Sequence, residues 1–216
     1  MYYYVLSEKL YFPPVEKADD EGLLCVGGDL KPERLLLAYR SGIFPWYNDD
    51  VPLWWCPDPR FVLFPHELKI SKSMRPLLNG TKYEFRYNTS FREVITACKT
   101  TTRKDEAGTW INEDIIEAYC RLHQMGKAVS FECWENHVLI GGLYGVRTGN
   151  VFFGESMFSH KTNASKFAFI KAVQQLINEG VVLIDCQIHS SHLESLGAGF
   201  ISRQDFIEIL KSNIDN

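Results

Sequence analysis

The sequence predicts an α+β fold in which a small, turn-rich N-terminal domain (residues 1–60) precedes a larger mixed-sheet domain (residues 61–216). Proline and glycine interrupt the first sixty residues so often that only short elements fit there. Beyond residue 60, strand-like segments and helical periodicities follow one another over longer stretches. A chain of 216 residues with 45% hydrophobic content is long enough to bury a sizeable core.

The first half of the chain supplies four predicted elements. A helix over 32–41 has a proline in its first turn and a glycine directly after it, as helix starts and ends favour. Residues 61–64 and 82–87 have strand character. Ser90 with Glu93 makes a capping-box pattern, which opens a helix that extends to about residue 99.

The second half alternates helices with strands. We expect helices at 112–125, 164–179, near 192–196 and at 202–210, and strands at 128–134, 138–146, 150–157 and 181–184. The first three strands should form an antiparallel meander, and the wholly apolar fourth should be buried on both faces. This order of antiparallel strands, helix and buried strand resembles the core of acetyltransferase-type (GNAT) folds.

That resemblance raises the question of acetyl-CoA. Acetyltransferases of this type hold the CoA pyrophosphate on glycine-rich backbone at a helix N-terminus. The corresponding loop here, residues 159–165, contains no glycine. The sequence therefore disfavours CoA, and we expect no cofactor.

Other classes are disfavoured by composition and spacing. No apolar run approaches the roughly 18 residues of a membrane span, and the chain does not start like a secretory signal, so we expect a cytoplasmic protein. The six cysteines contain no C-x-x-C and no regular framework, which favours reduced, mostly buried thiols. His189 and His192 form a close pair without a nearby third ligand, so no metal site is expected.

Charge is distributed unevenly along the chain. The net charge is −4, yet the stretch from residue 60 to 104 holds ten Lys or Arg and three Glu. This stretch is either a solvated face or a basic patch that holds a phosphate backbone. Charge alone does not choose between the two.

The best candidates for chemistry follow two predicted strands. Glu155 lies at the end of one strand, and Asp185 and Gln187 follow the buried apolar strand. Strand ends of this kind are where polar groups converge on a ligand. If the two ends meet, two carboxylates and an amide face one cavity and can move a proton. Each carboxylate is alternatively a satisfied structural acceptor. No pattern for a covalent acyl-enzyme is present.

Tryptophans in turn-rich segments provide a second indication. Trp54 and Trp55 are expected to pack between the two domains. Trp46 and Trp110 are candidates for stacking on nucleobases, which contributes about 1–3 kcal/mol for each base.

At these residues the chain resembles the leucyl/phenylalanyl-tRNA–protein transferase family, from about residue 22 to 206. The motifs that carry the resemblance are Gly-Gly-Asp-Leu (27–30), Tyr-Arg-Ser-Gly-Ile-Phe-Pro-Trp (39–46), Trp-Trp-Cys-Pro-Asp-Pro-Arg (54–60), Gly-Thr-Trp-Ile (108–111), Gly-Glu-Ser-Met-Phe-Ser (154–159), Asn-Ala-Ser-Lys (163–166) and Leu-Ile-Asp-Cys-Gln (183–187). Their number and order make a chance match very improbable.

The resemblance implies an aminoacyltransferase of the leucyltransferase class. It would move Leu or Phe, and Met less readily, from aminoacyl-tRNA to proteins that begin with Arg or Lys, which creates an N-degron for proteolysis. By the same resemblance, Asp185 would accept the amine proton, directly or through Gln187, and Glu155 would attract the acceptor's N-terminus or the donor's ammonium. Trp46 and Trp110 would flank the terminal adenine. Whether a protein carboxylate or the tRNA ribose relays the proton stays open, and we expect a monomer.

Donor selection requires an apolar recess that rejects β-branched and charged side chains. Each apolar candidate is equally suited to the core. The substrate-binding candidates that accompany Trp46 and Trp110 are Tyr144, Phe153, Ser156, Met157, Asn163, Ser165, Phe169, Val173 and Ile184.

The tRNA backbone is expected to contact the basic stretch. The candidates are Lys72, Arg75, Lys82, Arg86 and Arg103. Relatives often carry more Lys or Arg where this chain has Pro-Leu-Leu at 76–78, so phosphate contact is expected to be weaker there.

Two rival classes remain, which are CoA-dependent acylation and a non-catalytic RNA-binding module. The glycine-free loop disfavours the first, and the carboxylate after the buried strand disfavours the second.

Overall fold

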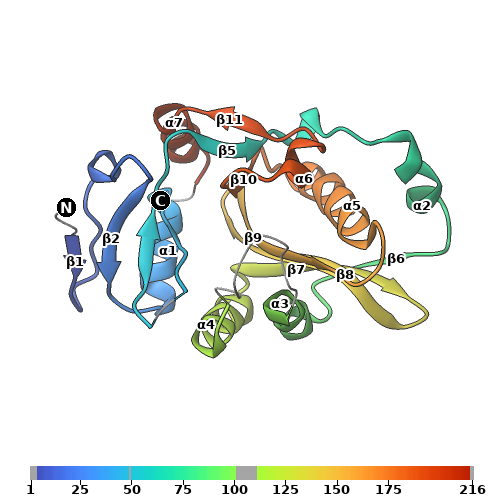
Figure 1. Ribbon diagram of the computed structural model, residues 1–216, viewed down its shortest axis with the longest axis horizontal. Coiled ribbons are helices and arrows are strands. Elements are labelled where there is room, and N and C mark those ends of the chain that lie inside the picture. The colour runs from blue at the N-terminus through green and yellow to red at the C-terminus, as the bar shows by residue number, and fades with distance from the viewer. Residues whose placement is uncertain (1–3, 49, 101–110, 215–216) are drawn as a thin grey trace.

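The structure is a computed structural model, and it describes residues 4–48, 50–100 and 111–214. Its strands form two sheets (Figure 1). The smaller sheet has the order β1-β2-β4-β3, with bounds β1 Tyr4–Leu6, β2 Leu23–Gly27, β3 Phe44–Pro45 and β4 Leu53–Trp55. These short strands account for the turn-rich composition of the first sixty residues.

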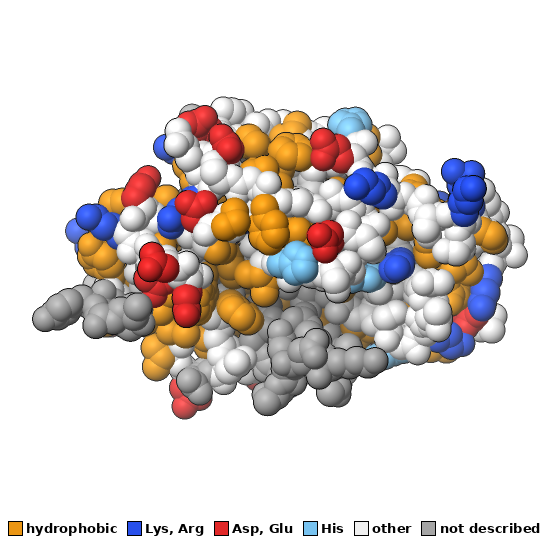
Figure 2. Space-filling view, turned by 45° about the horizontal axis from the view of Figure 1, so that its top comes forward, with side chains coloured by type: hydrophobic (Ala, Val, Ile, Leu, Met, Phe, Trp, Pro, Cys, Tyr) orange, Lys and Arg blue, Asp and Glu red, His pale blue; other side chains and the backbone are white. Residues whose placement is uncertain are grey.

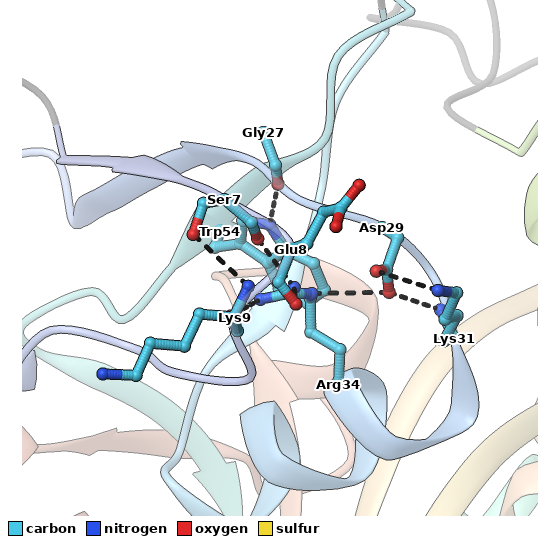
Figure 3. A network of polar contacts seen from close by, with 8 residues as sticks. All are labelled: Ser7, Glu8, Lys9, Gly27, Asp29, Lys31, Arg34 and Trp54. Carbon is cyan, nitrogen blue, oxygen red and sulfur yellow. Dashed lines mark hydrogen bonds and ion pairs between the residues drawn. The ribbon is translucent and has the colours of Figure 1, made fainter.

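The N-terminal unit is fixed by one buried arginine. Arg34 lies in α1 (Pro32–Arg40), the helix predicted from its proline start. Its guanidinium donates to the backbone oxygens of Ser7 and Lys9, at 2.9 and 3.2 Å, and to the Asp29 carboxylate (Figure 3). Burial of this charge is tolerable because several acceptors surround it. The network ties the segment after β1 to the helix.

The larger sheet has the order β11-β5-β10-β9-β8-β7-β6. Its bounds are β5 Arg60–Leu63, β6 Glu84–Tyr87, β7 Ala128–Glu135, β8 Val138–Thr148, β9 Val151–Ser159, β10 Leu183–Gln187 and β11 Gly199–Ile201. The predicted antiparallel meander β7-β8-β9 is confirmed, and the helix crossover brings β10 parallel to β9. β1 to β4 and β11 were not predicted, because strands this short leave too little periodicity to read.

Helices cover both faces of the larger sheet. In Figure 1, α5 lies on one face and α3 and α4 lie on the other. The helix bounds are α2 Arg75–Asn79, α3 Phe91–Thr100, α4 Glu113–Gln124, α5 Ala164–Asn178, α6 Ser191–Glu194 and α7 Arg203–Asn213, and short 3-10 helices occupy Val15–Lys17, Pro65–Glu67 and Lys72–Met74. Asn112 and Ser202 cap α4 and α7, since each side chain accepts a backbone N–H in the first turn of its helix, whereas the side chain of Asn163 makes no such bond to α5.

The predicted fold class is therefore confirmed: an α+β protein with a small N-terminal sheet and a larger mixed sheet. The division at residue 60 stays a prediction, because a single apolar cluster joins the two sheets. In that cluster Tyr39 of the N-terminal unit packs on Phe153 of β9, with ring centroids 5.0 Å apart. Trp54 packs on Phe12 within the small unit, with ring centroids 4.9 Å apart.

Two further expectations concern cysteine and the membrane. All six cysteines are free thiols, five of them buried and Cys186 partly exposed. Among the helices of the described residues, none has both the length and the apolar character needed to cross a bilayer.

Candidate active site

Two strand irregularities create the site. β9 and β10 stay paired until Phe153 lies opposite Asp185. Just beyond this pair each strand carries one extra residue, Glu155 in β9 relative to β8 and Cys186 in β10 relative to β5. Bulges bend a strand and redirect its side chains. The polar residues predicted at strand ends therefore lie at bulges inside strands, which sequence periodicity did not indicate.

An open cavity of about 620 Å³ lies at these bulges. Apolar side chains of β9, α5 and β10 line one part of it, namely Met157, Phe169 and Ile184. Trp46, directly after β3, lines another part, so the two sheets share the cavity. The volume falls in the range of sites that hold a small molecule or the end of a larger one.

Glu155 is the sole carboxylate among the described residues that line the cavity. Its two oxygens accept hydrogen bonds from the Tyr119 hydroxyl at 2.7 Å and from Gln187 Nε2 at 2.8 Å. A further short hydrogen bond joins the hydroxyls of Tyr119 and Tyr39. Burial raises the pKa of Glu155 to about 7, against the opposing effect of its hydrogen bonds from the two tyrosines.

Asp185 does not face the cavity. Its carboxylate accepts two hydrogen bonds from Arg60, at 2.8 Å from Nε and 2.6 Å from Nη2, and both side chains are 0% exposed. The Arg60 guanidinium lies between the rings of Phe44 and Phe206, 4.7 and 4.5 Å from their centroids. This corrects the expectation that two carboxylates share the cavity. Asp185 instead pairs in the interior with Arg60, which is 125 residues away in the sequence.

Comparison with known proteins now places the chain. A family profile described as "Leucyl/phenylalanyl-tRNA protein transferase" matches residues 62–211, and a profile for that family's N-terminal domain matches residues 28–58. The chain belongs to this family. Two relatives are named leucyl/phenylalanyl-tRNA–protein transferase. That of Flavobacterium johnsoniae is 56% identical over 97% of this chain and 99% of its own, and that of Christiangramia forsetii is 57% identical over 96% and 99%.

Solved structures give more distant matches. A GCN5-related N-acetyltransferase from Kribbella flavida is 11% identical with a TM-score of 0.41, over 79% of this chain and 61% of that one. A protein from Bacteroides thetaiotaomicron is also 11% identical, with a TM-score of 0.47, over 70% of this chain and 55% of that one.

The structure brings together only part of the predicted substrate-binding set for this family. Trp46, Ser156, Met157, Ser165, Phe169 and Ile184 line the cavity, as do Glu155 and Gln187. Tyr144, Phe153, Asn163 and Val173 do not. Tyr144, Phe153 and Val173 belong to the buried core, the alternative that the sequence left open for each apolar candidate. Asn163 precedes α5 in a left-handed conformation, with φ +65°.

Of the predicted tRNA-backbone residues, the four that the structure describes do not line the cavity. Lys72, Arg75 and Lys82 are exposed around α2, and most of the charged side chains that Figure 2 shows at that end of the molecule are Lys or Arg. Arg86 is already paired with Glu84 at 2.8 Å and lies over the Trp134 ring. Trp110 and Arg103 fall outside the described residues.

Sequence reasoning missed several residues of the site. Tyr39 and Tyr119 were placed on apolar helix faces, and periodicity carries no signal for the hydroxyl groups that reach Glu155. Arg60 precedes the apolar residues of β5, and a charge at this position could have indicated a buried ion pair. His189 and His192 also line the cavity, and burial, followed by the charge of Lys166, lowers the pKa of His192.

Proposed function

We propose that this protein is an aminoacyltransferase that moves Leu or Phe, and Met less readily, from aminoacyl-tRNA to the N-terminal Arg or Lys of acceptor proteins. Family membership and one observation support this function: a single cavity combines an apolar wall, an indole and a carboxylate with its amide partner. The product would carry a destabilising N-terminal residue and be directed to regulated proteolysis.

The donor would enter along the apolar wall. Met157, Phe169 and Ile184 offer a surface that favours a benzyl side chain or an apolar side chain without a branch at Cβ, and that excludes charged side chains through desolvation. Trp46 is half-buried at the cavity, its ring 5.7 Å from that of Trp55, which also donates from Nε1 to the Trp46 backbone oxygen at 2.6 Å. A ring held in this way is suited to stack on the terminal adenine.

The acceptor would approach the polar side of the cavity. An aminoacyl ester is already activated, so the protein must mainly position the amine, remove its proton and stabilise the oxyanion. The negative charge of Glu155 would attract a basic N-terminus, and the side-chain amide of Gln187 lies beside this carboxylate. We also propose that Ser156 and Ser165, which line the cavity, contact the substrate.

The tRNA backbone would be held by Lys72, Arg75 and Lys82. These exposed cations are not engaged by any ion pair among the described residues, whereas Arg86 is paired with Glu84. Such contacts add affinity without base specificity. The glycine-free loop at 159–165 supports transfer without CoA, and we also propose that the protein acts in the cytoplasm as a monomer.

Transfer of labelled Phe tests this function. Purified protein receives Phe-tRNA labelled in Phe and a protein that begins with Arg, and the label should enter that protein. A matched acceptor beginning with Glu should stay unlabelled. Binding of tRNA without transfer would favour an RNA-binding module, and consumption of acetyl-CoA without tRNA would favour a CoA-dependent acyltransferase.

A further inference from the structure

Two carboxylates lie close to the bulges of the neighbouring strands β9 and β10, but one of them alone lines the cavity. Glu155 lines the cavity and Asp185 does not. The family resemblance assigned proton acceptance to Asp185, so the geometry raises the question of which group receives the proton.

Both oxygens of the buried Asp185 carboxylate already accept hydrogen bonds. Its Oδ1 accepts from Arg60 Nε at 2.8 Å and from the Gln187 backbone N–H at 2.9 Å, and its Oδ2 accepts from Arg60 Nη2. Protonation would leave the buried Arg60 charge without a counterion, which is strongly unfavourable. A proton on Asp185 would also have no path to the cavity through this pair, since neither side chain is exposed.

The Asp185 carboxylate instead fixes the backbone of Gln187. Gln187 adopts φ +66°, the left-handed region that residues other than glycine seldom occupy. The hydrogen bond from its N–H to Asp185 Oδ1 holds this conformation. In that conformation the side-chain amide reaches the cavity and donates to Glu155 Oε1 at 2.8 Å.

Glu155 has the opposite character. It accepts from two neutral donors, Tyr119 and Gln187, and no ion pair with a described Lys, Arg or His engages it. It nevertheless lines the cavity, is 7% exposed and is the extra residue of the β9 bulge. A carboxylate without a counterion, held by neutral donors, is free to take up a proton.

We propose that Glu155 accepts the proton of the acceptor amine, and that Asp185 is a positioning residue that acts through Gln187 with Arg60 as its counterion. This proposal rests on the proposed function. The amine nitrogen forms a bond to the ester carbonyl carbon, the bond from that carbon to the 3′ oxygen breaks, and the proton that leaves nitrogen passes through Glu155 to the 3′ oxygen. Atoms and charge balance without a further reactant.

The electrostatic surroundings agree with this role. A pKa of about 7 for Glu155 lies near the value at which a general base works best at neutral pH. The charged and titratable groups that interact with Glu155 come from several neighbouring elements: Tyr39 of α1, Tyr119 of α4, Arg60 of β5 and Asp185 of β10, and the Gln187 amide of β10 adds a hydrogen bond.

The pH dependence of kcat/KM for the Arg-starting acceptor tests the proposal. An acceptor amine has a pKa of roughly 7.7–8.0 and must be neutral to react. Because Glu155 must also be ionised, log kcat/KM of the wild-type protein should rise with a slope of two below pH 6. Glu155→Gln should lower kcat/KM by about 10²–10⁴-fold and reduce the slope to one.

A matched pair of variants separates positioning from proton transfer. Arg60→Gln with Asp185→Asn removes both buried charges together, and Gln187→Gly keeps the left-handed backbone while it removes the amide. Both should lower kcat/KM less than Glu155→Gln does and keep the slope of two. If Asp185 relayed the proton through Gln187, either change would lower kcat/KM at least as much as Glu155→Gln does.

The outcomes distinguish the proposal from the function on which it rests. A wild-type protein that transfers Phe with a slope of one, or a Glu155→Gln variant that keeps a slope of two, overturns this proposal alone. A slope of one in the wild type would point to a group that does not titrate, such as the ribose hydroxyl. A wild-type protein that transfers no Phe overturns the proposed function, and this proposal with it.

Discussion

Arg60 and Asp185 are 125 residues apart in the chain and form a two-bonded ion pair inside the protein, where neither side chain is exposed. Arg60 opens the first strand of the larger sheet and Asp185 lies on the neighbouring strand, so the pair joins β5 to β10. The rings of Phe44 and Phe206 enclose the guanidinium, which links the N-terminal unit and α7 to the same point.

The ion pair should dominate the stability of this region. Asp185→Ala should lower the free energy of unfolding by about 3–5 kcal/mol, because it leaves the buried Arg60 charge uncompensated. Replacement of both partners, Arg60→Met with Asp185→Leu, should restore most of that loss. Urea denaturation at pH 7 measures both variants. A loss below about 1 kcal/mol for the single variant would contradict the burial of this pair.

Glu155 should make folding less favourable as its carboxylate ionises. Its pKa rises from the ordinary 4.5 to about 7 in the folded state, so between these values the folded protein binds more protons than the unfolded chain. Stability therefore falls as pH increases through this window, by up to about 3 kcal/mol. Glu155→Gln should be more stable than the wild type at pH 8 and no more stable at pH 4. Equal differences at both pH values would show that Glu155 has no raised pKa.

Trp46 should contribute to donor affinity. Trp46→Ala should raise KM for Phe-tRNA by a factor that corresponds to about 1–3 kcal/mol of stacking, with a smaller change in kcat. Trp46→Phe keeps a ring and should recover part of the affinity. Steady-state kinetics with Phe-tRNA as the varied substrate measures both. An unchanged KM in the alanine variant would remove the indole from the donor site.

The exposed cations around α2 should control salt dependence. Lys72→Ala with Arg75→Ala should reduce the slope of log affinity for tRNA against log salt by about 1.4–1.8, because two phosphate contacts are lost. Arg86→Ala is the matched control, since Glu84 already neutralises that side chain. Filter binding over a series of salt concentrations gives the slopes. If the double variant and the control behave alike, the patch takes no part in binding.

Much of the fold follows from local sequence. The helices α4 and α7 start where their sequences predict, and Asn112 and Ser202 cap them because capping involves neighbours within one turn. The meander and α5 were equally readable from periodicity. Three apolar residues that line the cavity, Met157, Phe169 and Ile184, were also predicted from the sequence as substrate-binding candidates. Tyr144 and Phe153, of the same residue class, are buried core instead.

The sequence alone thus determined the helices, the long strands, the family and the residue types available for chemistry. The tertiary structure decided which of the two carboxylates on neighbouring strands lines the cavity. Periodicity and residue type report on contacts within a few positions, whereas the placement of a charge depends on partners from distant segments. Arg60 binds the Asp185 carboxylate in the interior, whereas Tyr119 and Gln187 donate hydrogen bonds to Glu155 at the cavity.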